Sequence, residues 1–157
     1  MMFLITFLII VESFKTKQYT FIVPGLLTAL YSALYSPYSV LLTVLAPDPD
    51  AMRVDSIIER ILIIVIAVIL CILFSKGIIN KCCAIFAVLA AVVRWCWFLV
   101  FYVFQYYART PGIDAYRLFN QAAAVYNGFQ IAVAILLLTT QILLWLNLRK
   151  YRHNSRI

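Results

Sequence analysis

Long stretches without charge constrain this chain more than any other feature. Residues 118–148 contain no Asp, Glu, Lys or Arg, and as a helix this stretch would be about 46 Å long. About 20 apolar residues already cross a hydrocarbon core roughly 30 Å thick. With 66% hydrophobic and 12% charged residues, the chain has no segment polar enough for a large catalytic or nucleic-acid-binding domain outside a membrane. The sequence therefore predicts an all-α integral membrane protein.

Uncharged runs divide the chain into a predicted bundle of four transmembrane helices. We expect these spans at about residues 20–45, 56–75, 82–107 and 118–148. They form a transmembrane domain over 18–148, preceded by a short apolar segment (1–17) and followed by a basic cytoplasmic tail (149–157).

Two details refine the first two spans. Pro37 lies inside the first span and predicts a kink, because proline removes a backbone amide and clashes with the preceding turn. Ser56 and Glu59 have the spacing of a capping box, which predicts that the second helix begins there.

The N-terminal segment is ambiguous because residues 1–11 form only about 16 Å of helix, too little to cross a bilayer comfortably. An interfacial helix, or an extension of the first span, is the favoured interpretation. A short extra span and a cleaved signal peptide are the alternatives.

Basic residues are distributed unevenly between the two predicted sides. With both termini on the cytoplasmic side, eight basic residues and Glu12 lie inside, and four basic residues face five acids outside. The positive-inside rule favours this orientation. The inner basic residues are Lys15, Lys17, Lys76, Lys81, Arg149, Lys150, Arg152 and Arg156.

Arg94 is the strongest single functional signal. It lies near the middle of the third span, where a guanidinium costs roughly 2.5–3.5 kcal/mol on insertion scales. The acids lie near span ends, so we expect none at the same depth. The favoured interpretation is a structural arginine that meets the fourth span near Asn127 or Gln130. The alternative is a site for an anion, a lipid head group or an acid of a partner.

Side-chain amides recur along the fourth span at Asn120, Asn127 and Gln141, with Gln130 close to Asn127. The first three share a seven-residue repeat, so they predict a polar stripe on one helix face. Amides on such a stripe form hydrogen bonds between packed helices, and a polar pathway is the alternative. We expect part of this face to contact a second copy or another membrane protein.

Hydroxyls line one half of the first span. Tyr31, Tyr35 and Tyr38 occur at i, i+4 and i+7, so they lie on one side of a helix. Packing or an aromatic belt at the interface is the favoured interpretation, because a tyrosine hydroxyl in hydrocarbon needs a partner. A pocket wall is the alternative.

Two groups near the predicted inner interface are candidates for lipid contact. Cys82 and Cys83 follow Lys81, a position that suits S-palmitoylation, with unmodified thiols as the alternative. Basic residues of the tail are expected to orient the chain and to contact anionic lipid. These tail residues are Arg149, Lys150, Arg152 and Arg156.

No catalytic or metal-binding arrangement is recognisable in the sequence. The only histidine, His153, lies in the tail, and the four cysteines lack zinc or redox spacing. We therefore expect no enzyme, no cofactor and no nucleic-acid partner. The leading hypothesis is a non-catalytic accessory, adaptor or immunity-type factor that binds membrane lipids and a membrane protein or a second copy.

Two other function classes remain open. The first alternative is a small transporter or channel subunit with an anion or polar-substrate site around Arg94. A membrane enzyme acting on lipids ranks last, because it lacks paired carboxylates and an activated nucleophile.

Overall fold

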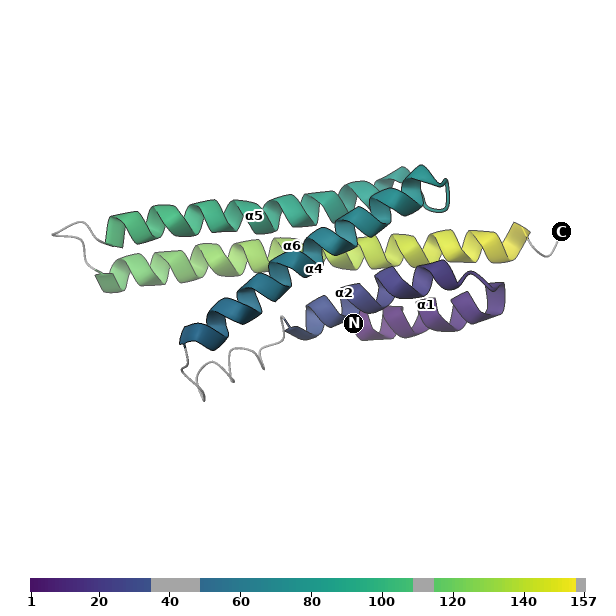
Figure 1. Cartoon of the computed structure of the whole chain (residues 1–157), viewed down its shortest axis with the longest axis horizontal. Coiled ribbons are helices and arrows are strands. Elements are labelled where there is room, and N and C mark those ends of the chain that lie inside the picture. The colour runs from purple at the N-terminus through teal and green to yellow at the C-terminus, as the bar shows by residue number, and fades with distance from the viewer. Residues whose placement is uncertain (35–48, 109–114, 155–157) are drawn as a thin grey trace.

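The computed structural model describes the backbone of residues 1–34, 49–108 and 115–154 (Figure 1). This part of the chain is helical and contains no strand, which confirms the predicted all-α class. The elements are α1 (Met2–Thr16), the 3-10 helix η1 (Tyr19–Phe21), α2 (Ile22–Leu34), α4 (Pro49–Ser75), α5 (Lys81–Ala108) and α6 (Ala115–Asn154).

The N-terminal segment folds back on itself as a helical hairpin. Lys17 ends α1 in the left-handed conformation (φ 58°), and the Gln18 amide donates to the Ser13 carbonyl, 3.0 Å away. This C-cap reverses the chain into η1 and α2. The interpretation of α1 as an extension of the first span is therefore wrong. Of the predicted span 20–45, residues 35–45, with Pro37, lie outside the described residues.

The second long helix begins earlier than the capping box predicts. α4 starts at Pro49, and proline suits the first helical position because its missing amide would have no partner there. Ser56 and Glu59 are thus inside the helix, and the predicted start is wrong. At the other end Gly77 (φ 68°) terminates the helix. The Ile78 amide then donates to the Leu73 carbonyl at 3.0 Å.

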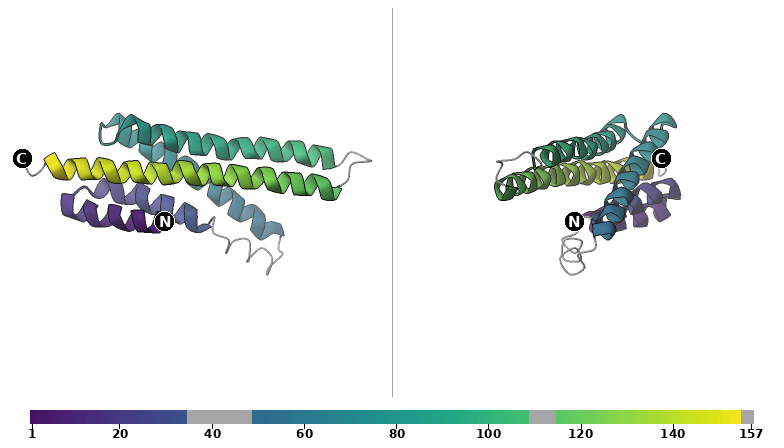
Figure 2. Two further views of the ribbon diagram at one scale, coloured as in Figure 1. Left: turned by 180° about the vertical axis from the view of Figure 1, so that it is seen from behind. Right: turned by 60° about the vertical axis from the view of Figure 1, so that its left-hand side comes forward.

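α5 and α6 form a long pair whose axes run side by side (Figure 1). α5 coincides with the predicted span 82–107 to within one residue at each end. α6 contains the whole of 118–148 and has 40 residues, about 60 Å of helix. α1 and α2 pack along the C-terminal half of α6, and α4 crosses the bundle obliquely (Figures 1 and 2).

The core consists of apolar side chains contributed mainly by α4, α5 and α6. Ile63, Ile66, Leu70, Ala87 and Leu137 are fully buried in it. Ile9, Phe21 and Tyr31 extend the same cluster into the N-terminal hairpin. The hairpin is therefore part of the bundle.

Two helical segments are long and apolar enough to cross a membrane, namely Ile58–Ser75 and Asn127–Tyr151. Only 33% of each segment is buried inside the bundle. The remainder presents large aliphatic side chains outward, among them Ile61, Val68, Ile131 and Leu146. An apolar outer surface of this kind is what a hydrocarbon environment favours.

Candidate functional site

Arg94 is buried inside the bundle and forms an ion pair with Glu59. Nη2 of Arg94 donates to Oε2 of Glu59 at 2.6 Å. The side chains are 5% and 11% exposed, so little solvent screens the pair. A charge-assisted hydrogen bond of this kind is stronger than a neutral one. The pair joins α5 to α4 and leaves this part of the interior with no net charge.

A third polar side chain completes this cluster. Tyr31 of α2, 2% exposed, interacts with the Glu59 carboxylate. Its ring is part of the core cluster, beside the ion pair. Three helices contribute one group each, so the cluster specifies how α2, α4 and α5 pack together. Tyr31 is buried in the core, while Tyr35 and Tyr38 lie outside the described residues.

One expectation about Arg94 is wrong. An acid does lie at its depth, because Glu59 is inside α4 and not at its beginning. Its ion-pair partner comes from the second predicted span. The expected contact of Arg94 with the fourth span near Asn127 or Gln130 stays a prediction. The Glu59 carboxylate balances the charge of the guanidinium, which disfavours the binding of a further anion beside it.

Gln141 is the centre of a second buried polar cluster. It is fully buried, and its Nε2 donates to Oγ1 of Thr6 at 2.9 Å and to Oγ1 of Thr28 at 2.7 Å. Both hydroxyls in turn donate to the Gly25 carbonyl. The cluster connects α6 to α1 and α2, as an interhelical amide does in membrane proteins. The glutamine of the predicted stripe therefore bonds within its own chain.

The other amides of the stripe have different surroundings. Asn127 is exposed, and Gln130 is half-buried with an Oε1 that has no hydrogen-bond partner among the described residues. The side chain of Asn120 is outside the described residues, although its backbone is helical. Of the residues in the seven-residue repeat, Gln141 thus makes contacts within the bundle, whereas Asn127 faces outward.

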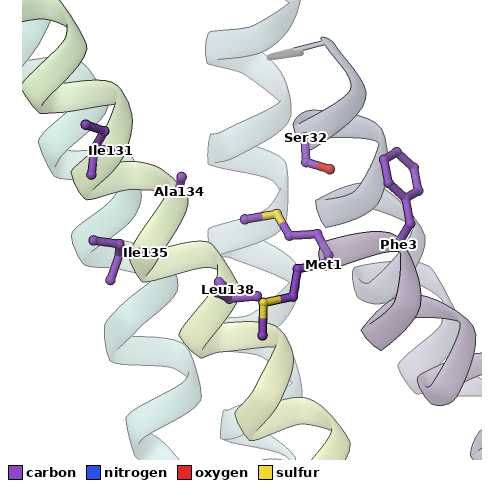
Figure 3. Close-up of a pocket in the computed structure, with 8 residues that line it drawn as sticks. Met1, Phe3, Ser32, Ile131, Ala134, Ile135 and Leu138 are labelled. Carbon is purple, nitrogen blue, oxygen red and sulfur yellow. The ribbon is translucent and has the colours of Figure 1, made fainter. Parts of the chain in front are cut away.

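A groove of about 380 Å³ opens between the first turn of α1, α2 and the middle of α6 (Figure 3). Met1, Phe3, Ile135 and Leu138 contribute to its apolar wall. The hydroxyl of Ser32, which also lines it, donates to the Ala29 carbonyl. The groove suits a hydrocarbon chain better than a polar substrate. Met1 thereby lies beside the middle of α6.

The adjacent cysteines differ in environment. Cys82 is exposed, whereas Cys83 is buried. The Cys83 thiol donates a hydrogen bond to the Thr140 carbonyl, 3.6 Å away. Cys82 is therefore the thiol that a modifying reagent or enzyme can reach.

In the tail, Arg149 and Lys150 are exposed. The Arg149 guanidinium lies 4.9 Å from the ring centre of Trp145. The backbone at Arg152 is helical, and Arg156 lies outside the described residues.

Sequence reasoning missed two residues that complete these clusters, namely Glu59 and Thr6. Pro49 was a usable signal for Glu59, because a proline at the first helical position would have moved the helix start upstream. No comparable signal marks Thr6, which lies singly in an apolar run. No protein-family model, curated protein or solved structure matches the chain.

Proposed function

We propose that the chain is a small multi-pass membrane protein, with four transmembrane helices, that acts without catalysis by binding other membrane proteins or lipids. The observation that carries the proposal is the exposed amide of Asn127 on the apolar outer face of α6. An amide that faces hydrocarbon lacks hydrogen bonds, and a neighbouring polar helix would supply them.

The surroundings of Asn127 favour a helix as its partner. Ala124 and Gly128 are exposed beside it, and a Cβ atom added to Gly128 would meet nothing within 4 Å. Small residues four apart let the backbones of two helices approach closely in a membrane. Ile131 and Ile135 continue the same exposed surface. This part of α6 can therefore receive a transmembrane helix of a second copy or of another membrane protein.

The transporter or channel alternative has less support. Glu59 neutralises Arg94 within the bundle, so a second anion beside Arg94 would be repelled by the carboxylate. The groove beside α6 is lined almost wholly by apolar side chains. Neither feature provides a polar route for a solute.

Asn127→Leu tests the proposal in nanodiscs or native membranes. We expect association to weaken by about 1–2 kcal/mol, the scale of interhelical hydrogen bonds, as measured by crosslinking and light scattering. Val125→Leu, an exposed position on the same helix, is the matched control and should associate like the wild type. A wild type that stays monomeric and partnerless in lipid would refute this function.

Topology is tested separately with a tag on the C-terminus. We expect it on the cytoplasmic side, because the basic residues of the connection at Lys76 and Lys81 and of the tail share one end of the bundle. A tag that is labelled from outside intact cells would overturn the orientation.

A further inference from the structure

Three segments that are distant in sequence meet at one end of the bundle. They are the α1–α2 connection, the α4–α5 connection and the C-terminal end of α6 (Figures 1 and 2). Tyr151 joins them, since its hydroxyl donates to the Ile78 carbonyl at 3.1 Å. Its ring meets that of Phe21 edge-on, with centroids 6.1 Å apart. The end of α6 is thus fixed against both connections.

Positive charge is concentrated on this end. Glu12 is the only acid in residues 12–22, 74–84 and 144–154. Six basic side chains in the same ranges are exposed: Lys15, Lys17, Lys76, Lys81, Arg149 and Lys150. We name these six residues the basic platform. Two come from each of the three segments, so the tertiary structure, and not one run of sequence, assembles the charge.

The surroundings of the basic platform place it at the edge of the apolar surface. Phe14 and Tyr19 are exposed and pack edge-on with centroids 5.6 Å apart, and Phe74 is also exposed. Arg149 is held over the Trp145 ring, which orders its guanidinium at the same level. Aromatic and basic residues in this combination are typical of the depth of lipid head groups.

We propose that the basic platform binds the head groups of anionic phospholipids, with Tyr151 holding the α4–α5 connection and the end of α6 in position. The proposal rests on the membrane insertion proposed above. Six cations against one acid complement a negatively charged lipid surface. If the basic residues served only to orient the chain in the membrane, their charges would suffice and the contacts of Tyr151 would not be needed.

The experiment uses the full chain with Trp95→Phe and Trp97→Phe, so that Trp145 reports from the basic platform. The protein is reconstituted in phosphatidylcholine containing either brominated phosphatidylglycerol or brominated phosphatidylcholine. Quenching of Trp145 then gives the binding constant of the anionic lipid relative to the zwitterionic one. We expect a preference of about three- to tenfold at low salt, which 1 M salt should remove because the Debye length falls to roughly 3 Å.

Lys76→Gln with Lys81→Gln should lower this preference at least threefold. Arg53→Gln with Arg117→Gln removes the same amount of positive charge from helix segments at the opposite end of the bundle. This control should leave the lipid preference unchanged. Tyr151→Phe keeps the ring but removes the bond to Ile78, and it should lower the preference without a change in net charge.

Each opposing result has a defined meaning. Equal quenching by the two brominated lipids in the wild type would overturn the proposal while leaving the membrane protein in place. If the Arg53 and Arg117 control lost as much preference as the lysine variant, the preference would reflect only the net charge of the protein. That result would also overturn the proposal. A full preference in Tyr151→Phe would refute the role of the tyrosine. No quenching by any lipid would instead contradict the proposed membrane insertion.

Discussion

Removing only one partner of the Arg94–Glu59 pair should be far more damaging than removing both. Arg94→Leu leaves a carboxylate that is 11% exposed without its partner at 2.6 Å. Loss of one partner of a buried pair costs about 3–5 kcal/mol, whereas replacing both by apolar side chains is neutral or stabilising by about 1–4 kcal/mol. We therefore expect Glu59→Leu/Arg94→Leu to be at least as stable as the wild type.

The fully buried thiol of Cys83 provides the assay, since it reacts only when α5 separates from α6. With the other three cysteines replaced by alanine, its labelling rate along a detergent titration gives the free energy of unfolding of each variant. Val92→Leu, at an exposed position on the same helix, should change that energy by less than about 0.5 kcal/mol. The buried pair would be refuted if Arg94→Leu were as stable as the wild type while the double variant were less stable than Arg94→Leu and less stable than Glu59→Leu.

Three further outcomes are expected from the packing. Gln141→Leu should lower the unfolding free energy by about 1–2 kcal/mol in the same assay, because it removes the two hydrogen bonds to α1 and α2. Gly25→Leu should destabilise by about 1–3 kcal/mol, because even a Cβ there would lie 3.3 Å from an α1 side chain, while Gly128→Leu, in open space, should not. In native membranes a maleimide should label Cys82 and spare Cys83; equal labelling of both would contradict the packing of α5 on α6.

The helices themselves were largely predictable from local properties. The start and end of α5 agree with the apolar run that predicts it, in which Arg94 is the only charge, because charge and proline bound such runs and helix length follows from residue count. The start of α4 was not predictable, because the capping-box spacing at Ser56 and the proline at position 49 indicate different start positions. Two valid start signals within one apolar helix cannot be ranked without knowing what the side chains contact.

The burial of the individual amides in the predicted stripe was also not predictable from the sequence. Periodicity places Asn127 and Gln141 on the same face of α6, yet one is exposed and the other fully buried. The difference arises because the α1–α2 hairpin covers only the C-terminal half of α6. Helical periodicity specifies a direction around the axis, but not how far along the axis a neighbour extends.

By itself the sequence determined that the chain is helical, apolar on its outside and basic in particular connections, since composition and spacing act locally along the chain. Only the tertiary structure decided that Glu59 meets Arg94. Glu59 lies 16 residues before the end of α4 and Arg94 lies 13 after the start of α5, about 24 Å and 20 Å from their shared turn. Partners between helices depend on where the chain turns and at what angle the helices cross, and those quantities arise from packing the whole bundle.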